Sequence, residues 1–352
     1  MKCGIQFFPA VGPQQKSASQ YWSEALHLTH VAEKLGFTSV RTVEHYFHPY
    51  GGYSPNPMIF LAAAAAVTRN MRLITGAVLP VFSHPLKLAS DIGMLDAISD
   101  GRLEIGFARA FLPHEFERFA IALDESRGRF DEGVGQIAAL LEQEGVTADG
   151  KFHSYRNVTT LPRPTQQPRP PFWIAALSTP ESFVAAGRLG HNMMAIPLAG
   201  SQMKDLLSIY RTSWRDAGRP GKGQEMLAFH MFCAPTREKA LDTARPHLNA
   251  YLKSIVDAAS DWTTGAASKD YPNYHKMIAG LAKETADSTI EKGGAWIGMP
   301  DDIVEAAHSY AGQIGGFDIA SLQVNFGNLG VEDAEASMHL FAREVMPHLA
   351  KI

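Results

Sequence analysis

The residues best suited to acid–base chemistry lie in the run 44–48, which reads Glu44-His45-Tyr46-Phe47-His48. The run follows an apolar segment and leads into a loop rich in aromatic residues and glycine. Histidine titrates near neutral pH, so His45 beside Glu44 is suited to proton transfer in an aromatic pocket. The same position is also compatible with a structural histidine bonded to a neighbouring carbonyl. Position alone leaves both roles open.

Residues suited to binding an anion follow two later apolar segments. Arg109 comes directly after one of them, and Arg127 lies near the start of the next helical pattern. Guanidinium groups pair with phosphate through parallel hydrogen bonds. Ser178 and Thr179 precede a helix, whose N-terminal amides attract anions. Together these four residues predict a phosphate site. Considered alone, Arg127 is more typical of a surface arginine paired with an acidic residue. Ser178 and Thr179, considered alone, are more typical of an ordinary helix cap.

A third segment ends in small residues, Thr75-Gly76-Ala77. Small side chains let a flat ring lie against the backbone, so this position is suited to an aromatic ligand. The alanine run 62–66 favours a close-packed helix seam or a dimer interface instead.

The elements that must position these residues alternate along the chain. Short, mostly apolar segments are typical of parallel strands buried on both faces, and they are Lys2–Phe8, Ser39–Val43, Arg72–Leu79, Leu103–Phe107, Phe172–Ala175, Asn192–Ile196, Met226–Cys233 and Ile319–Asn325. Helical patterns lie between them, at Ser19–Leu35, Pro57–Val67, Leu86–Ile98, Ser126–Glu144, Pro180–Arg188, Ser201–Ala217, Thr236–Ala259, Pro300–Ile314 and Val331–Leu349. This α/β alternation favours a closed (β/α)8 TIM barrel, whose C-terminal mouth would gather the residues described above.

The chain is longer than a minimal barrel of about 250 residues. We expect one domain, residues 1–352, with two insertions. Thr147–Pro171 is rich in proline and polar residues and predicts a small extended excursion. Ser260–Gly294 has no sustained apolar period and predicts a long, mobile lid loop.

Composition and motifs argue against several classes of protein. The net charge is -4 with no basic block, which disfavours nucleic-acid and membrane-surface binding. Cys3 and Cys233 are too few for a disulfide framework, and the histidines lack the spacing of a metal site. The chain has no phosphate-loop, dinucleotide or nucleophile-elbow motif. Without a signal-like start or an apolar run of ~20 residues, we expect a cytoplasmic protein without a metal.

Three groups of motifs carry a family resemblance: Glu44-His45-Tyr46-Phe47, the segment HPLKLASDIGMLDAISDGRLEIGFAR at 84–109, and the C-terminal GMPDDIVEAA and ASMHLFAREVMPHL. Together they resemble the luciferase-like, flavin-dependent monooxygenases, and most closely the bacterial luciferase α-subunit branch. The resemblance covers essentially the whole chain. It implies a (β/α)8 barrel that binds reduced FMN at its C-terminal mouth.

The resemblance also implies roles for individual residues. His45 becomes the active-site histidine, Arg109 and Arg127 bind the flavin phosphate, and Ser178–Thr179 form the phosphate loop. A cis non-proline peptide is expected near Gly76-Ala77, under the flavin ring.

The sequence departs from luciferase at three positions in this region. Ala108 replaces a reactive cysteine, Ala176-Leu177 replaces an acid–serine pair, and Tyr46 replaces a second histidine. Flavin binding beside Ala108 and Ala176 is still expected, whereas light emission from a long-chain aldehyde is not. These changes indicate a different substrate pocket.

The implied activity is that of an FMNH2-dependent, two-component monooxygenase. In this family reduced FMN and O2 form a flavin C4a-(hydro)peroxide, which oxygenates a small organic substrate by aldehyde or ketone oxidation or by hydroxylation. His45 would act as base or acid, and a water-excluding mouth is predicted from Phe7, Phe8, Tyr46, Phe47, Tyr53, Phe111 and Phe326.

Two partners are expected. A separate NAD(P)H:flavin reductase follows from the missing nicotinamide motif, and a homodimer follows from relatives that pair through their second and third helices. Two other functions stay open: a deazaflavin (F420)-dependent oxidoreductase that transfers hydride without O2, and a non-catalytic flavin-binding protein.

Overall fold

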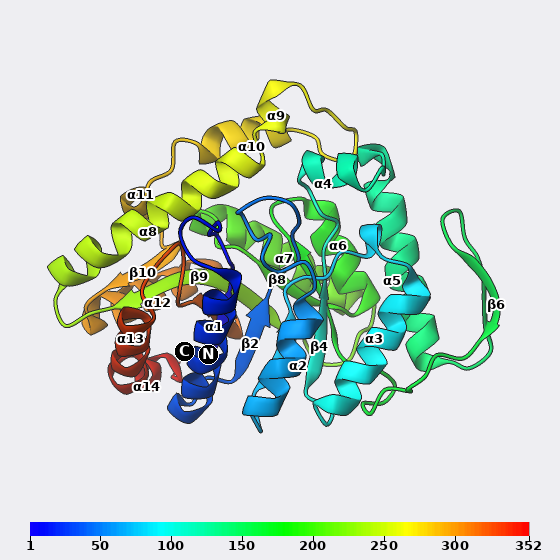
Figure 1. Ribbon diagram of the computed structural model, residues 1–352, viewed down its shortest axis with the longest axis horizontal. Helices are drawn as coiled ribbons and strands as arrows, with labels where there is room; N and C mark the ends of the chain where they lie inside the picture. Colours follow the sequence, from blue (N-terminus) through cyan, green and yellow to red (C-terminus); the bar gives the residue numbers. More distant parts are fainter. Residues whose placement is uncertain (352) are drawn as a thin grey trace.

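The computed structural model describes residues 1–351 and has a closed barrel of eight parallel strands at its centre (Figure 1). In chain order the barrel strands are β1 (Lys2–Phe7), β2 (Ser39–Thr42), β3 (Arg72–Thr75), β4 (Leu103–Phe107), β7 (Phe172–Ala176), β8 (Asn192–Ala195), β9 (Glu225–Cys233) and β11 (Ile319–Gln323). Each strand pairs in parallel with the next, and β11 closes the barrel against β1 with Ser321 opposite Gly4. The predicted TIM barrel is confirmed, and each predicted strand segment holds one of its strands.

Helices surround the barrel and cover the outer faces of its strands (Figure 1). They are α1 (Ala18–Leu35), α2 (Pro57–Val67), α3 (Pro85–Ile98), α5 (Ser126–Glu142), α6 (Pro180–Leu189), α7 (Gly200–Asp216), α8 (Arg237–Ala258), α12 (Pro300–Ile314) and α13 (Val331–Glu344). Local signals set their ends. The Ser17 hydroxyl caps α1 by accepting from the backbone N–H of Gln20, and Gly36 ends α1 in the left-handed conformation. Gly190 ends α6 in the same way.

Several short elements were not predicted. Two 3-10 turns, η1 (Pro80–Phe82) and η2 (Leu123–Glu125), and one helix, α4 (Pro113–Arg118), lie in loops after β3 and β4. Strand β10 (Ala295–Gly298) pairs with the C-terminal half of β9. The predicted helix Val331–Leu349 is two helices, because α13 ends at Glu344 and α14 (Met346–Leu349) carries Pro347 in its first turn. Proline has no N–H to continue the helical ladder.

The two insertions take different forms. Strands β5 (Val146–Asp149) and β6 (Ser154–Val158) form an antiparallel hairpin that projects from the side of the barrel (Figure 1), an extended excursion as predicted. The segment 260–294 contains three short helices, α9 (Asp261–Thr264), α10 (Tyr274–Leu281) and α11 (Ala286–Glu291). The expectation of a loop without secondary structure was therefore wrong there. The mobility of this segment stays a prediction.

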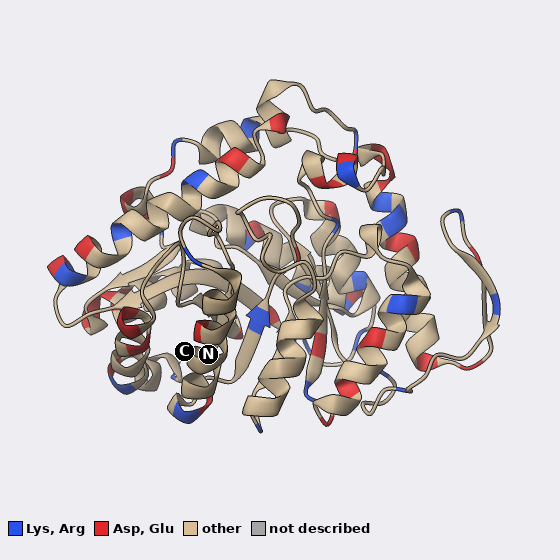
Figure 2. Cartoon of the chain, viewed as in Figure 1, with Lys and Arg blue, Asp and Glu red and all other residues tan. Residues whose placement is uncertain are grey.

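The surface carries both signs of charge. Lys and Arg alternate with Asp and Glu along the outer helices (Figure 2). Within residues 1–351, no helix combines the length and the apolar character that crossing a bilayer requires.

Candidate active site

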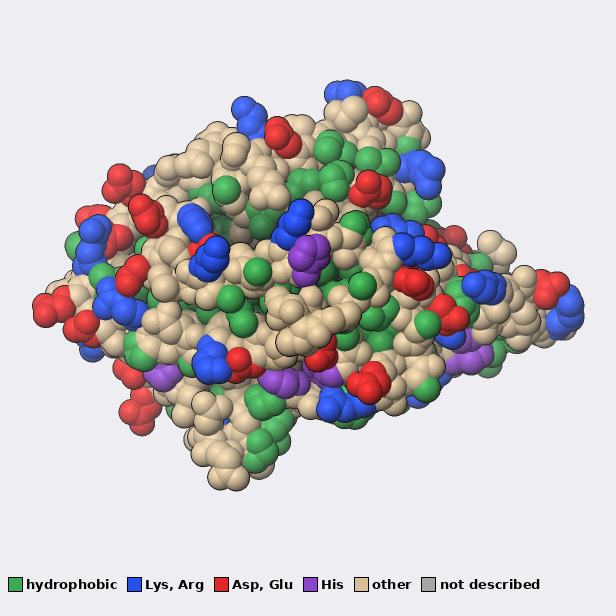
Figure 3. Space-filling view, turned by 90° about the horizontal axis from the view of Figure 1, so that it is seen from above, with side chains coloured by type: hydrophobic (Ala, Val, Ile, Leu, Met, Phe, Trp, Pro, Cys, Tyr) green, Lys and Arg blue, Asp and Glu red, His purple; other side chains and the backbone are tan. Residues whose placement is uncertain are grey.

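A cavity of about 730 Å³ opens at the C-terminal end of the barrel. Residues of all eight barrel strands, or residues directly after them, line it, together with parts of α5, α6, α8 and α10. In Figure 3, which is seen from above, green hydrophobic side chains lie in hollows near the middle of this face, with charged side chains around them. The cavity is where the sequence placed the chemistry.

His45 lines the cavity and is held by a carboxylate that sequence reasoning missed. Its Nδ1 lies 3.1 Å from Oε1 of Glu115, a fully buried residue of α4. The same oxygen accepts the backbone N–H of Tyr46 at 2.8 Å. Because a carboxylate oxygen accepts hydrogen bonds, Nδ1 of His45 is the donor in this contact, which keeps Nε2 available. Nε2 makes no hydrogen bond with any residue of 1–351.

Close packing fixes the orientation of the His45 ring. The rings of Phe8 and Tyr50 lie 5.5 and 5.2 Å from it, measured between centroids. A Cβ atom on Gly51 would lie 2.7 Å from Cδ2 of His45, so only glycine allows this approach. Gly51 also has a φ of 82°, which favours glycine. The histidine therefore presents one ring edge to the cavity on a rigid support.

Glu44 also lines the cavity but serves a different purpose. Its Oε1 accepts a 2.6 Å hydrogen bond from the Tyr46 hydroxyl, and its Oε2 accepts the backbone N–H of Leu79 at 3.1 Å. Burial raises the pKa of Glu44 to about 8, although these two hydrogen bonds act in the opposite direction. Glu44 is thus not the partner of His45. It is a buried carboxyl group that keeps a proton near neutral pH.

Three guanidinium groups gather at one side of the cavity. Arg109 follows β4, Arg127 lies in the first turn of α5, and Arg188 lies on α6. None of them pairs with a carboxylate group in the part of the chain that the structure describes; Arg109 donates only to the Asp270 carbonyl, at 3.2 Å. Partial burial raises the pKa of nearby Asp131, although the Arg127, Arg109 and Arg188 cations oppose the rise. This arginine cluster is suited to a phosphate.

Only one of the two hydroxyl residues predicted for the phosphate loop lines the cavity together with the arginine cluster. Thr179 lines the cavity at the start of α6, whereas Ser178 does not. Thr179 is the N-cap residue of α6, but its side chain makes no capping hydrogen bond, so the predicted hydroxyl cap is absent. The Thr179 hydroxyl and the first amides of α6 remain available to an anion.

The small residues predicted to lie under a flat ring have mixed positions. Gly76, Ala77, Ala108 and Ala176 line the cavity, and the Gly76–Ala77 peptide bond is cis, as expected from the resemblance. Thr75 lies behind them. It is fully buried, and its hydroxyl donates to the Gly106 carbonyl and accepts the Gly106 N–H, so it joins β3 to β4.

The predicted aromatic wall is also corrected. Of the seven aromatic residues expected at the mouth, Phe8 and Phe111 line the cavity. Phe7 packs outward against Phe60, and Phe47 is exposed. Tyr50, from the predicted aromatic loop after β2, also lines the cavity, and so do Phe130, Tyr251 and Tyr274, which the sequence did not single out. The positions of Phe130, Tyr251 and Tyr274 depend on the helices α5, α8 and α10, which the strand pattern does not specify.

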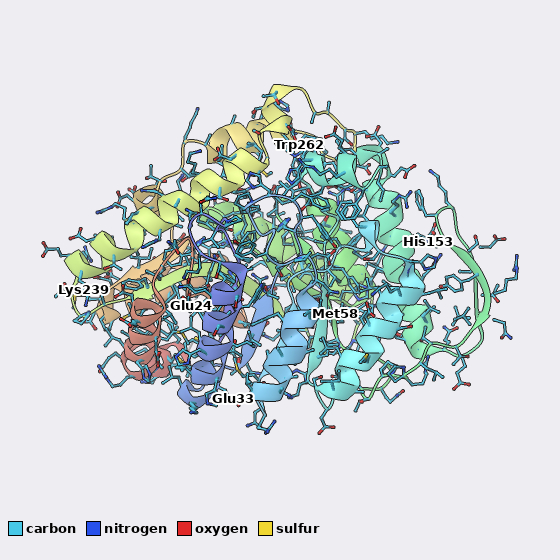
Figure 4. The ribbon with its side chains drawn as sticks, in the orientation of Figure 1. Glu24, Glu33, Met58, His153, Lys239 and Trp262 are labelled. Atoms are coloured by element: carbon cyan, nitrogen blue, oxygen red, sulfur yellow. The ribbon has the colours of Figure 1, made fainter. Side chains whose placement is uncertain are left out.

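The segment 260–294 lies against the arginine side of the mouth. Nε1 of Trp262, labelled at the top of Figure 4, donates to the Phe111 carbonyl at 2.8 Å. The Tyr271 hydroxyl donates to the Ala110 carbonyl at 2.8 Å, and the Tyr271 ring lies 4.9 Å from the Arg109 guanidinium carbon. Oδ2 of Asp270 accepts the backbone N–H of Arg127. The segment therefore contacts two of the three arginines.

The donor set of the cavity fits FMN and does not suggest a metal. Three guanidiniums and a hydroxyl that have no carboxylate partner within residues 1–351 match a phosphate dianion, and four small residues leave room for a flat ring. In residues 1–351 no three His, Cys, Asp or Glu side chains lie close enough together to hold a metal ion.

A closed barrel with an arginine cluster and a carboxylate-supported histidine in one cavity is the arrangement of a TIM-barrel enzyme whose mouth can bind an anionic ligand. Residues 1–315 match the family model described as luciferase-like monooxygenase, and the chain belongs to this family of flavin-dependent oxidoreductases.

Three relatives show the range of this family. The monooxygenase RslO1 from Streptomyces bottropensis is 41% identical, with 99% of this chain and 100% of that chain covered and a TM-score of 0.88. The oxygenase component of flavin-dependent trigonelline monooxygenase from Acinetobacter baylyi is 28% identical over 95% of this chain and 91% of its own length. The oxygenating constituent of 3,6-diketocamphane monooxygenase from Pseudomonas putida, solved in complex with FMN, is 21% identical, with 99% of this chain and 98% of that chain covered and a TM-score of 0.83. F420-dependent enzymes share the fold as well, with TM-scores of 0.74 and 0.76.

Proposed function

We propose that this protein is the oxygenase component of a two-component monooxygenase that uses reduced FMN and O2. One observation carries the proposal: a single cavity holds both a cluster of unpaired arginines and the His45–Glu115 pair. The trigonelline monooxygenase relative is itself an oxygenase component, which supports a separate NAD(P)H:flavin reductase as the partner. A cytoplasmic location stays a prediction from the sequence.

Each group has a distinct task in this proposal. Arg109, Arg127, Arg188 and Thr179 bind the phosphate, and Gly76, Ala77, Ala108 and Ala176 leave space for the ring system. When bound, reduced FMN supplies two electrons, so that one atom of O2 enters the substrate and the other leaves as water. His45 takes up or returns the proton at Nε2 while Glu115 holds the ring in position. The apolar walls and the segment 260–294 exclude water.

The site test compares two substitutions. His45→Ala is expected to lower turnover by about 100-fold while the affinity for FMN changes little, because general acid–base catalysis contributes in this range. Arg109→Ala is expected to weaken FMN binding by about ten-fold or more, because it removes a charge-assisted contact with the phosphate. Flavin fluorescence titrations measure affinity, and product formation measures turnover. Parent-like behaviour of both variants would refute the site assignment.

The test of the activity itself is isotopic. Protein, FMN, a flavin reductase and NADH are mixed under 18O2 with a panel of aldehydes, ketones and phenols. Mass spectrometry should find one 18O atom in a product. Hydride transfer from reduced F420 to a substrate, without O2 uptake, would support the F420-dependent alternative. Binding of FMN without O2 uptake would support the non-catalytic alternative.

A further inference from the structure

Four polar side chains form a continuous row inside the barrel. They are Gln6 on β1, Arg41 on β2, His230 on β9 and Gln323 on β11, and all four line the cavity. Strand pairing places them in one register, with Gln6 opposite both Arg41 and Gln323, and Gln323 opposite His230. Branched aliphatic residues usually fill the interior of such barrels. We call these four residues the polar row.

Arg41 gives the polar row a positive charge without a counter-charge. The residue is 8% exposed, and it forms no ion pair with any residue of 1–351. Its Nη1 has only the Met194 sulfur at 3.5 Å, and its Nε is buried without a partner. Burial lowers the pKa of Arg41 to about 10, so the group is still a cation at neutral pH. A buried cation of this kind is costly unless an anion pairs with it.

The other members of the polar row also have unused hydrogen-bonding capacity. Nε2 of His230 is buried without a partner, and burial lowers the pKa of His230 to about 3, so the ring is neutral. Nε2 of Gln323 has one long contact, 3.4 Å, with the Phe8 carbonyl. The Gln6 side chain makes no hydrogen bond within the described chain, although it is 6% exposed. Amide N–H groups that face a cavity are suited to an oxygen acceptor.

The polar row lies across the barrel from the arginine cluster. Arg109 and Thr179 follow β4 and β7, which are the fourth and fifth strands in barrel order, whereas the polar row spans β9, β11, β1 and β2. A coenzyme phosphate bound by the arginine cluster therefore leaves the polar row to another part of the cavity. The Arg41 stem packs under Gly76, where an added Cβ would lie 2.1 Å from Cδ of Arg41. The guanidinium is thus held beside the predicted ring position.

We infer that the polar row binds an anionic oxygen group of the organic substrate, a carboxylate or an ionised enol or phenol, with Arg41 as its counter-charge. The inference rests on the proposed function for the identity of the reaction, and it adds the chemical class of the substrate. Gln6, Gln323 and His230 complete the contacts around the anion. A substrate with this group is oriented by it, so the carbon to be oxygenated lies toward the ring position.

The test measures binding of three probes to the protein with and without FMN by titration calorimetry at pH 7.5. Benzoate presents a carboxylate, 4-nitrophenolate presents an ionised phenol, and benzamide is the neutral analogue of benzoate. At least one anion should bind about ten-fold or more tighter than benzamide, as expected when a buried charge gains its partner. The anion that binds more tightly identifies the group as carboxylate or phenolate.

Two variants and one control link this preference to Arg41. Arg41→Gln should abolish the preference, and Arg41→Lys should keep part of it. Arg215→Gln removes one positive charge from an exposed residue outside the cavity and should behave like the parent. Equal binding of all probes by the parent, no binding of either anion, or an unchanged preference in Arg41→Gln would overturn the inference. If Arg41→Gln does not fold, loss of the preference in Arg41→Lys overturns it.

Flavin titrations of the same samples separate this inference from the proposed function. If the parent protein binds FMN but shows no anion preference, only the inference that the polar row binds an anion is refuted. A parent that prefers anions but binds no FMN refutes the monooxygenase proposal alone. Loss of FMN affinity in Arg41→Gln together with no anion preference in the parent would assign Arg41 to the coenzyme.

Discussion

The carboxylate that supports His45 is that of Glu115 and not that of the adjacent Glu44. The neighbour in sequence, Glu44, binds Tyr46 and Leu79, and the carboxylate that contacts His45 comes from α4, 70 residues further along the chain. A carboxylate behind a histidine fixes its tautomer and stabilises the imidazolium that forms when Nε2 takes a proton, as in hydrolase triads. We therefore assign Glu115 as a positioning residue for His45.

Glu115→Gln tests this role. The amide keeps the shape and can still accept from Nδ1, but it removes the negative charge that favours the protonated ring. We expect turnover to fall by about 10- to 100-fold with little change in FMN affinity. The pH–rate profile should also shift to lower pH. A variant with lower turnover but an unshifted profile would indicate a merely structural role.

Glu44 predicts a pH dependence of stability. Its folded pKa of about 8 lies above the value of about 4.3 for an unfolded chain. Between these values the folded state binds more protons than the unfolded state, so stability falls as pH rises from about 4 to 8. Glu44→Gln mimics the protonated form, so the variant should not lose the stability that the parent loses when Glu44 ionises. Thermal melts from pH 5 to 9 should show the variant gaining about 3–5 °C over the parent at the alkaline end. If the melting temperatures of the parent and the variant differ by the same amount at every pH from 5 to 9, the raised pKa of Glu44 is contradicted.

Most of the residues that the sequence predicted for the site line the cavity, but the sequence did not identify their partners. His45, Arg109 and Arg127 were found because each follows a buried strand or starts a helix in a barrel whose mouth gathers such positions. Glu115 was missed because it lies in the six-residue helix α4, which is too short for a periodic pattern. Arg188 was missed because its position depends on how α6 packs. The polar row does have a signal in the sequence, because Gln6, Arg41 and Gln323 are polar residues inside apolar segments.

At the scale of elements, the barrel could be predicted because its strands are buried on both faces and read as short apolar runs. The segment 260–294 could not be predicted in the same way. Its helices are four to eight residues long, and contacts with the barrel mouth hold them: Trp262 with Phe111, and Tyr271 with Ala110. Helices this short are unstable alone, so their sequence carries little helical signal.

Tyr271 is the residue with which to test the segment as a cover. Tyr271→Ala removes its hydrogen bond to Ala110 and its ring from Arg109. We expect water to reach the site, so that the share of O2 released as hydrogen peroxide rises about three-fold or more. Limited proteolysis within 260–294 should become faster. Tyr155→Ala in the β5–β6 hairpin is the matched control and should leave both measurements unchanged. A Tyr271→Ala protein that releases no more hydrogen peroxide than the parent, and is cleaved no faster within 260–294, would contradict the covering role.

At the scale of the whole molecule, the cavity has two positively charged ends that differ in burial. The arginine cluster after β4 and β7 is partly exposed and suits a soluble phosphate, whereas the polar row on β9, β11, β1 and β2 is buried. His45, at the end of β2, lies in the same cavity between the mouth and the polar row. This arrangement allows the coenzyme and the substrate to enter from one mouth and still occupy separate ends.

The outer face of α2 and α3 predicts how two molecules associate. These adjacent helices (Figure 1) expose Ile59, Val67, Met94 and Ile98, with exposed fractions of 71, 38, 58 and 51%. An apolar face of this kind favours burial against a second copy. We propose a homodimer through α2 and α3, in line with the pairing expected from the family resemblance.

Ile59→Glu should break this dimer, because it would bury a carboxylate of each copy in the interface without a partner. Light scattering coupled to size-exclusion chromatography should give twice the monomer mass for the parent and the monomer mass for the variant. Leu161→Glu, at an apolar residue that is 72% exposed beside the hairpin, is the matched control and should stay dimeric. FMN affinity should be unchanged, since the cavity lies inside the barrel. A monomeric parent, or a dimeric Ile59→Glu protein, would rule out this face as the interface.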